Sequence, residues 1–472
     1  MIPARTFANR DLGVFGLARS GLSSIAGLKA AGARVYAWDE NADARAEAGR
    51  LGAHVAPFDA WPWQRIRTVV LSPGIPLTHP KPHPVVIAAR EAGAEVIGDV
   101  EIFAREIRPD RSKPGRAPVI AVTGTNGKST TTALIGHILN SCGFQVAIGG
   151  NIGTPALELA PIGGRTIYVL EISSYQIDLA PGLVPDIAVL TNITPDHLER
   201  HGSLANYATV KARLLEQTAI DGHIIVGVDD SLSSSIYTRL AANHGAVSIP
   251  VSVGKVLGRG VFVVGGALYD AWSHGSTQVM NLAQAPHLPG AHNWQNAALA
   301  YAAVRPFVKD ARAVASAIAN FPGLAHRMED VGRIGNVQFI NDSKATNADA
   351  AERALGCFTD IFWIAGGRAK KGGISSLLRY ASHIQKAYLI GEAAEEFAEV
   401  LKDRVACEIT GTLERATTGA YSDAVRTSAV APVVLLSPAC ASFDQFQDFE
   451  ERGDRFRALV TDLAGTAERE AS

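Results

Sequence analysis

A short glycine-rich segment carries the clearest chemistry in the sequence. The apolar run Val119–Val122 leads into Thr123-Gly124-Thr125-Asn126-Gly127-Lys128-Ser129, and a stretch with helical character follows. Small residues in such a loop let successive backbone N–H groups converge on phosphate oxygens, while the lysine and the start of the helix add positive charge. The hydroxyl of Ser129 is then placed to bind Mg²⁺. The segment therefore predicts a site for the phosphates of a nucleoside triphosphate.

This loop is shorter than the standard phosphate-binding loop. The pattern G-x-x-x-x-G-K-[ST] requires a glycine where Val122 stands. An ordinary Gly-Asn turn ahead of a helix is the alternative. The order of strand, loop and helix favours nucleotide binding over that alternative.

Polar residues also follow two later strands of the same region. Glu171 ends the apolar run YVLE, and His197 lies in NITPDHLERHG after another strand. In a parallel sheet that begins with a phosphate-binding loop, the carboxyl ends of the strands face the bound nucleotide. Both side chains are therefore candidates for holding Mg²⁺. A structural salt bridge for Glu171 and a structural role for His197 are the alternatives. Lys211, in the helical run NYATVKARLLEQ, has the spacing of a surface lysine.

Three blocks of alternating strands and helices must position these residues. The first has strands at Leu12–Phe15 and Arg34–Trp38 around a helix at Leu22–Ala31. Asp39 follows the second strand and is placed either to bind a ribose or base or to cap the next segment. The second opens at Val119 and ends in the helix HNWQNAALAYAAV; the third opens near Phe321 and contains QFIND, IFWIAGG, AYLIG and PVVLLSP. This alternation predicts three α/β domains with mostly parallel sheets. The proline-rich stretch Arg108–Pro118 is interpreted as a linker, or alternatively as a surface loop.

Composition narrows the class of protein. The chain has 472 residues, with 44 Lys+Arg against 46 Asp+Glu and a net charge of -2, so neither nucleic acid nor a membrane surface is an expected partner. No apolar run approaches the roughly 20 residues that span a bilayer. The four cysteines are widely spaced, which suits neither a zinc site nor a disulfide framework. We expect a reduced, cytoplasmic protein.

Together the motifs resemble the Mur ligases, which are ATP-dependent amide-bond ligases of cell-wall peptide synthesis. The resemblance rests on GTNGKST, GGNIG, EISSYQ, NITPDHLERHG, the pair His292-Asn293 and HRME. Three further segments, NDSKATN, GGRAKKGG and LSPACASFDQFQDFEERG, are similar to those of members that add D-glutamate to UDP-N-acetylmuramoyl-L-alanine. The resemblance implies a Rossmann-like N-terminal domain (residues 1–112), a central P-loop ATPase-like domain with a mostly parallel sheet (113–320) and a Rossmann-like C-terminal domain (321–472).

The resemblance also implies a reaction. ATP phosphorylates the carboxylate of the nucleotide-linked L-alanine, and the amine of D-glutamate displaces phosphate from the acyl phosphate. ATP and two Mg²⁺ ions would be the cofactors, with Lys211 carrying a carbamate, and the protein would be a monomer. Closure of the domains would exclude water from the acyl phosphate.

Site residues follow from the matched positions. The resemblance implies catalytic roles for Lys128, His197, Lys211 and Arg327, and metal binding by Ser129, Glu171, His197 and Lys211. It implies ATP binding by Gly124, Thr125, Asn126, Gly127, Lys128, Ser129, Thr130, Asn293, Asn296, Arg327 and Asp342, with the two asparagines near adenine and Asp342 near the ribose. It implies UDP-substrate binding by Arg19, Ser20, Asp39, Ser72, Gly74 and Asn151, and D-glutamate binding by Lys344, Thr346, Lys370, Ser442 and Phe443. Arg19 and Phe443 differ from the residues common at their positions.

Rival functions remain at this stage. Another Mur-type or a folylpolyglutamate-type ligase is the alternative within the class, although no DNPR-like segment of a diaminopimelate-adding relative is present. A regulatory nucleotide-binding switch would not need Glu171, His197, Lys211 and Arg327. A nicotinamide dehydrogenase is disfavoured because Gly13, Gly16 and Gly21 do not fit G-x-G-x-x-G.

Overall fold

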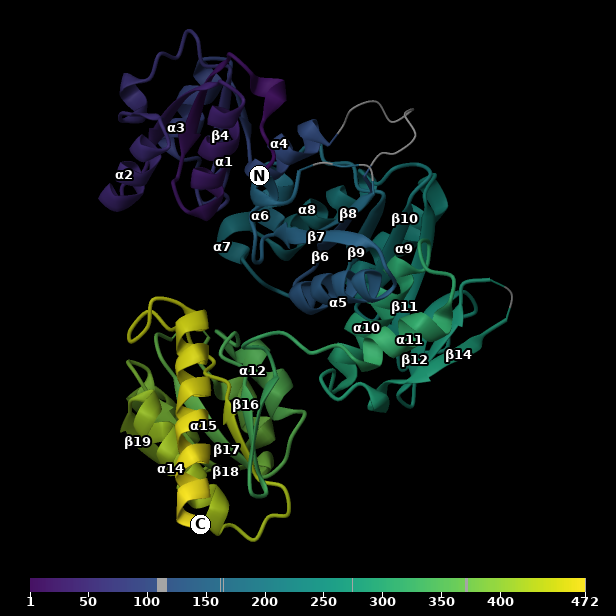
Figure 1. Cartoon of the computed structure of the whole chain (residues 1–472), viewed down its shortest axis with the longest axis vertical. Coiled ribbons are helices and arrows are strands. Elements are labelled where there is room, and N and C mark those ends of the chain that lie inside the picture. Colours follow the sequence, from purple (N-terminus) through teal and green to yellow (C-terminus); the bar gives the residue numbers. More distant parts are fainter. Residues whose placement is uncertain (108–116, 162, 164, 274, 370–371, 472) are drawn as a thin grey trace. The chain divides into compact units, whose positions relative to one another are not determined.

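Two compact units make up the chain. The structure, a computed structural model, describes residues 1–107, 117–161, 163, 165–273, 275–369 and 372–471 (Figure 1). One unit comprises residues 1–284 and 293–320, and the other comprises 285–292 and 321–472. Most of the expected linker, and Lys370, lie outside the described residues. The α/β class with mostly parallel sheets is confirmed, because each of the three predicted blocks forms a sheet.

The first sheet is an all-parallel, five-stranded sheet. Its strand order is β3-β2-β1-β4-β5, and every residue of the central strand β1 is buried, as expected for a strand covered on both faces. The strands are β1 (Asp11–Phe15), β2 (Arg34–Trp38), β3 (His54–Val55), β4 (Thr68–Leu71) and β5 (Glu95–Ile97). The helices are α1 (Arg19–Ala30), α2 (Ala42–Arg50), α3 (Pro84–Glu91) and α4 (Asp99–Glu106).

The central sheet has nine strands in the order β14-β13-β12-β11-β10-β9-β6-β8-β7. The strands β12, β13 and β14 pair antiparallel, an extension that the sequence analysis did not anticipate. The strands are β6 (Val119–Thr123), β7 (Gln145–Gly150), β8 (Thr166–Glu171), β9 (Ile187–Leu190), β10 (His223–Gly227), β11 (Val247–Val253), β12 (Gly260–Val264), β13 (Ala267–Ala271) and β14 (Thr277–Asn281). The helices are α5 (Lys128–Ser141), α6 (Ser174–Asp178), α7 (Leu198–His201), α8 (Leu204–Glu216), α9 (Ser231–Asn243), α10 (Ala291–Val304) and α11 (Ala311–Ala319).

One hydrophobic cluster joins the first and central sheets. It includes Phe103 of α4 and Tyr168 of β8, whose rings meet edge to face with centroids 5.3 Å apart. Backbone bonds cross the same boundary: the N–H of Ile2 donates to the carbonyl of Leu157, at 2.6 Å. The two sheets are therefore packed together within one unit.

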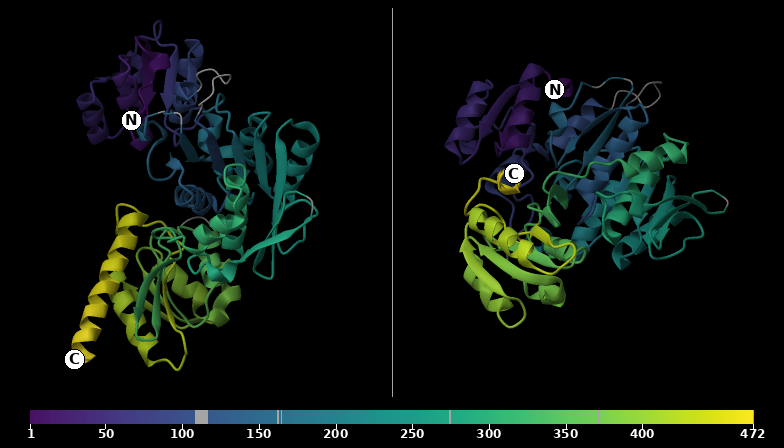
Figure 2. Two further views of the ribbon diagram at one scale, coloured as in Figure 1. Left: turned by 45° about the vertical axis from the view of Figure 1, so that its right-hand side comes forward. Right: turned by 60° about the horizontal axis from the view of Figure 1, so that its bottom comes forward.

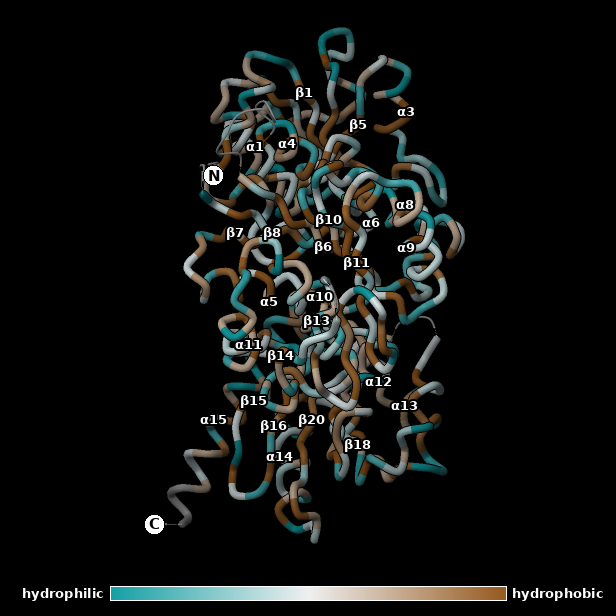
Figure 3. Tube along the Cα trace, turned by 90° about the vertical axis from the view of Figure 1, so that its right-hand side faces the viewer, coloured by the Kyte–Doolittle hydropathy of each residue, from teal (hydrophilic) through white to brown (hydrophobic). Residues whose placement is uncertain are grey.

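The second unit is built on a six-stranded sheet in the order β15-β16-β20-β17-β18-β19, parallel except for β15. One face packs against α12 and α13 and the other against α14 and the long α15, which runs along the sheet (Figure 2). Hydrophobic stretches follow strands such as β6 and β20 (Figure 3). The strands are β15 (Glu329–Ile334), β16 (Val337–Asn341), β17 (Ile361–Gly366), β18 (Ile384–Ile390), β19 (Cys407–Gly411) and β20 (Val433–Leu436). The helices are α12 (Ala348–Leu355), α13 (Ala394–Leu401), α14 (Leu413–Arg426) and α15 (Phe449–Ala471).

Two further observations concern cysteines and membrane segments. In the part of the chain that the structure describes, none of the four cysteines forms a disulfide bond. Within the described part of the chain, none of the helices combines the length and the apolar character needed to cross a membrane.

The shared cluster gives a stability prediction. Replacing Phe103 with alanine should lower the free energy of unfolding of the first unit by about 3–5 kcal/mol, because it removes a fully buried ring and leaves a cavity. Phe456→Ala, which removes an equally buried ring of α15, should instead destabilise the second unit. Urea unfolding that is monitored by hydrogen exchange measures the unfolding of each unit separately. Equal effects of both variants on both units would contradict the packing described here.

Candidate active site

The phosphate loop connects β6 to α5 as the sequence predicted. Gly127 precedes the helix with φ of 84°, and among the described residues no side chain caps this helix at its N-terminus. The Nζ of Lys128 donates to the carbonyl of Thr125, at 2.9 Å. A helix terminus of this kind, with a lysine beside it, suits a phosphate group.

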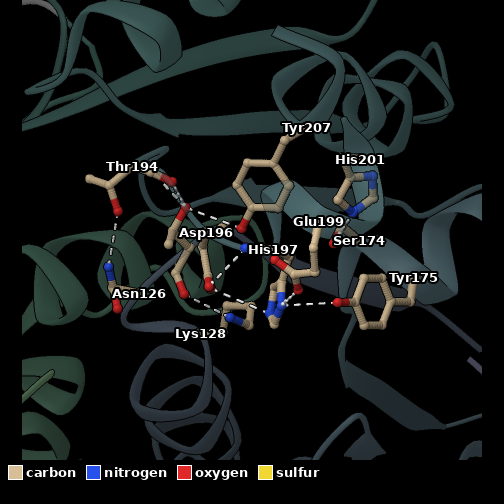
Figure 4. A network of polar contacts seen from close by, with 12 residues as sticks. Asn126, Lys128, Ser174, Tyr175, Thr194, Asp196, His197, Glu199, His201 and Tyr207 are labelled. Atoms are coloured by element: carbon tan, nitrogen blue, oxygen red, sulfur yellow. Dashed lines mark hydrogen bonds and ion pairs between the residues drawn. The ribbon is translucent and has the colours of Figure 1, made fainter. Parts of the chain in front are cut away.

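The segment that follows β9 holds this loop through direct hydrogen bonds. The carbonyl of Asn126 accepts from Thr191 Oγ1 at 2.6 Å and from Asn192 Nδ2 at 3.1 Å. The side chain of Asn126 also donates to Thr194 Oγ1, at 3.3 Å (Figure 4). A Cβ on Gly124 would lie 1.9 Å from Thr191 Oγ1, so the loop requires glycine there.

Asn296 of α10 closes the other side of the loop. Its Oδ1 accepts from Thr131 Oγ1, at 3.3 Å, and its Nδ2 donates to Asn293 Oδ1, at 3.2 Å. A Cβ on Gly127 would lie 2.2 Å from Asn296 Oδ1. Both asparagines are buried and lie at the loop, while their expected role at the adenine stays a prediction.

Glu171 ends β8, directly beside the strand that leads into the loop. It is 1% exposed, and its Oε1 accepts from Asn151 Nδ2, at 2.7 Å. Its Oε2 is buried and has no hydrogen-bond partner among the described residues. An unpaired buried carboxylate oxygen is costly, and it suits a hard cation such as Mg²⁺.

Lys211 is buried against the phosphate loop. It is 1% exposed, and its Nζ donates to the carbonyl of Gly124, at 2.7 Å. The interpretation of this residue as a surface lysine, based on spacing alone, is therefore wrong. Burial is the main cause that lowers the pKa of Lys211 well below its ordinary value of 10.5, and the charge of Lys128 lowers the pKa further. Asp196 and Glu171 act in the opposite direction.

His197 lies at the rim of the site, before α7, with φ of 52°. Its Nδ1 is 2.9 Å from the hydroxyl of Tyr175, and its Nε2 is 3.4 Å from Asp196 Oδ2 (Figure 4). The imidazole is 44% exposed. Tyr175, Asp196 and the buried Tyr207 were missed as contributors, although the first two belong to the quoted motifs EISSYQ and NITPDHLERHG.

Most candidates for the UDP substrate gather at the carboxyl ends of β2 and β4 and the start of α1. Asp39 accepts backbone bonds from Leu17 at 2.6 Å and from Asn41 at 2.8 Å, so its carboxylate shapes the turn. Ser72 donates to the carbonyl of Gly16, at 2.7 Å. Arg19, Ser20 and Gly74 lie at the same edge, whereas Asn151 lies beside Glu171.

The remaining candidates belong to the second unit. The carboxyl group of Asp342 accepts from the N–H of Met328 and from Ser437 Oγ, and burial raises its pKa to about 7. Lys344 Nζ lies 3.6 Å from the ring centroid of Phe449. Ser442 is buried, Phe443 is 63% exposed, and Arg327 and Thr346 are partly buried.

Arg353, which no quoted motif contains, and His292, from the quoted pair His292-Asn293, also belong to this unit. Burial lowers the pKa of His292 to about 4, and the charges of Arg353 and Arg327 lower it further. Arg353 lies on a helix whose sequence carries no recognisable motif.

Fold and site together define an α/β nucleotide-binding protein whose phosphate loop is flanked by a buried carboxylate and a buried lysine. Residues 122–304 match the model of the Mur ligase middle domain, and residues 326–440 match that of the Mur ligase glutamate ligase domain. The chain belongs to the Mur ligase family. It is thus an ATP-dependent ligase that forms amide bonds.

Similar proteins cover the whole chain. The UDP-N-acetylmuramoylalanine--D-glutamate ligase of Caulobacter vibrioides is 50% identical over 465 residues, which are 98% of each chain. The ligase of the same name from Nitrobacter winogradskyi is also 50% identical, over 98% of this chain and 99% of that one. Thermotoga maritima MurF ligase in complex with ADP shares the fold, with a TM-score of 0.59 and 15% identity over 98% of both chains.

The contact between Gly127 and Asn296 yields a matched pair of variants. Gly127→Ala should weaken ATP binding by at least about 100-fold, because the methyl group must displace Asn296 and the loop with it. Gly143→Ala, just after the other end of α5, has a similar φ of 86°, but no described residue lies within 4 Å of the added Cβ. It should lose stability by about 1–2 kcal/mol and keep its ATP affinity. Calorimetric titration and thermal melting separate these effects; equal ATP affinities in the two variants would contradict the assignment.

Proposed function

We propose that this protein joins D-glutamate to UDP-N-acetylmuramoyl-L-alanine, with cleavage of ATP to ADP and phosphate, in the synthesis of peptidoglycan precursors. The observation that carries this proposal is the 50% identity, over 98% of both chains, to a ligase of that name. The motifs NDSKATN, GGRAKKGG and LSPACASFDQFQDFEERG support the choice of D-glutamate.

Each substrate would be bound mainly by one domain. Residues 1–112 would bind the uridine nucleotide through Arg19, Ser20, Asp39, Ser72 and Gly74, with Asn151 from the central domain on the sugar side. Residues 113–320 would bind ATP. Residues 321–472 would bind D-glutamate through Lys344, Thr346, Lys370, Ser442 and Phe443; lysines and hydroxyls are the groups that a dicarboxylate requires.

In the first step, an oxygen of the L-alanine carboxylate attacks the γ-phosphorus of ATP, and ADP leaves. The loop amides and Lys128 would hold the phosphates and stabilise the negative charge that develops on them. Arg327 would contact the transferring phosphoryl group. The product of this step is an acyl phosphate.

In the second step, the amine nitrogen of D-glutamate attacks the acyl carbon, and inorganic phosphate leaves. The amine loses a proton as the amide bond forms. His197 would lie near the reacting carbonyl, oriented by the hydroxyl of Tyr175. Exclusion of water by the surrounding protein protects the acyl phosphate from hydrolysis.

The residues present fit Mg²⁺. The unpartnered Oε2 of Glu171 and the hydroxyl of Ser129 are oxygen donors of the kind this ion prefers. Glu171, Ser129, His197 and Lys211 would hold two Mg²⁺ ions together with phosphate oxygens, and the ions would neutralise charge on the phosphates. In the described residues, no group of three acidic, histidine or cysteine side chains comes together as a metal site.

Lys211 would supply a further anionic ligand as a carbamate. Only a neutral amine adds to CO₂; the nitrogen–carbon bond forms and one proton is released. Burial, which lowers the pKa of Lys211, favours that neutral amine near neutral pH. The lysine would then become an anion beside the phosphate loop.

A phosphate-release assay tests the proposed function. With ATP, Mg²⁺ and UDP-N-acetylmuramoyl-L-alanine, we expect sustained phosphate release only when D-glutamate is added. L-Glutamate, L-lysine and meso-diaminopimelate serve as controls and should give none. Release with a different amino acid would retain the ligase and refute the D-glutamate assignment. If folded protein binds ATP but releases no phosphate with any of them, a nucleotide-binding switch becomes the better interpretation.

Carbamylation is tested separately by ¹³C NMR after equilibration with ¹³C-bicarbonate. We expect a carbamate resonance that is absent in Lys211→Ala. The resonance should weaken as the pH falls, because protonation of the amine removes the form that reacts with CO₂. Lys211→Ala should lose most of its activity. A fully active variant, with no resonance in the natural sequence, would refute the carbamate.

A further inference from the structure

Arg200 connects the loop that follows β4 with the segment that carries His197. It lies on α7 and is only 6% exposed. Its Nη2 donates to the carbonyl of Ile75, at 3.3 Å. Ile75 directly follows Gly74, one of the residues proposed to bind the uridine nucleotide. One side chain therefore touches the substrate loop from within the catalytic segment.

On its other side, Arg200 stacks on Tyr175. Its guanidinium carbon lies 5.3 Å from the centroid of the Tyr175 ring, a cation–π arrangement. The hydroxyl of Tyr175 is 2.9 Å from His197 Nδ1, and the two rings are 5.0 Å apart (Figure 4). A continuous path of contacts therefore runs from the carbonyl of Ile75 to the imidazole of His197.

The backbone after α7 also packs against the same loop. Gly202 has φ of 77°, and a Cβ there would lie 2.9 Å from His79 Nε2. His201, which lies between Arg200 and Gly202 in the chain, contacts Ser174 Oγ at 2.9 Å. Burial lowers the pKa of His201 to about 4, so that its imidazole is neutral near pH 7. The turn at 200–202 is thus held by the loop on one side and by α6 on the other.

The stability of the fold does not explain why residue 200 carries a charged side chain. Nε and Nη1 of Arg200 are buried and have no hydrogen-bond partner among the described residues. Burial is the main cause that lowers the pKa of Arg200, and the carboxylate of Asp178, which forms its ion pair with Arg213, only partly offsets that effect. Apolar residues of similar volume often stabilise such a position more than a buried charge does.

We propose that Arg200 is a positioning residue that couples the uridine-nucleotide loop to the orientation of His197; this inference rests on the proposed function. The loop sets the position of the guanidinium, the guanidinium sets the ring of Tyr175, and the hydroxyl of Tyr175 fixes the imidazole. Arg200 acts on the reaction through His197 and contacts no reacting atom.

The test compares Arg200→Met with Arg213→Met. Arg213, on α8 of the same domain, pairs with Asp178; within the described part of the chain it has no hydrogen bond to the loop or to Tyr175. Arg200→Met should lower kcat by about 10- to 100-fold, the effect of a small misplacement at a reacting centre. The KM for ATP should change by less than about twofold, because the phosphate loop is untouched. Arg213→Met should leave kcat within about twofold of the natural enzyme.

A second pair of variants breaks the path at Tyr175. Tyr175→Phe should lower kcat, and the double variant with Arg200→Met should be no slower than the slower single variant, since both interrupt one path. Arg200→Lys, which keeps the charge but lacks the planar group, should also be slow and replaces Arg200→Met if the latter does not fold.

The outcomes are distinguishable. Unchanged kcat in a folded Arg200 variant, or additive losses in the double variant, would overturn the role of Arg200 while the natural enzyme remains active. An equal loss in Arg213→Met would reduce Arg200 to a structural residue. If the natural enzyme itself forms no amide from the UDP substrate and D-glutamate, the proposed function fails, and the inference fails with it.

Discussion

The hydrogen bond from the buried amine of Lys211 to the carbonyl of Gly124 is the interaction on which the site depends. A lysine can stay in such a place only if its charge is neutralised or matched, and here burial and the nearby Lys128 both favour the neutral form. The same amine fixes the first peptide of the phosphate loop. Loop geometry and the protonation of one lysine are therefore linked.

Contacts from other parts of the first unit also fix the shape of the phosphate loop. Thr191 and Asn192 hold the loop from the segment just after β9, and Asn296 closes it from α10. None of these three residues carries charge, so their contribution is shape and hydrogen-bonding geometry rather than electrostatic attraction. The shape of the phosphate loop is accordingly set by contacts within the protein itself, as preorganised catalysis requires.

Much of this could be predicted from the sequence because the signals are local. The strand–loop–helix order around Lys128 and the three α/β blocks depend on residues close together in the chain, and they were predicted correctly. The burial of Lys211 could not be derived from spacing, because it depends on β6 and α5, which lie far away in sequence. The roles of Asn296 and Tyr175 depend in the same way on tertiary contacts. The antiparallel strands β12–β14 were not predicted, although Gly265-Gly266, both with positive φ, form the two-residue turn that joins β12 to β13.

The bond between Thr131 and Asn296 joins residues 165 positions apart in the chain. During synthesis from the N-terminus, the phosphate loop leaves the ribosome long before the helix that closes it. Contacts of such long range form late in folding. The nascent chain therefore cannot gain stability from ATP until α10 has emerged and docked. Binding of ATP then stabilises only chains in which the whole first unit has already folded.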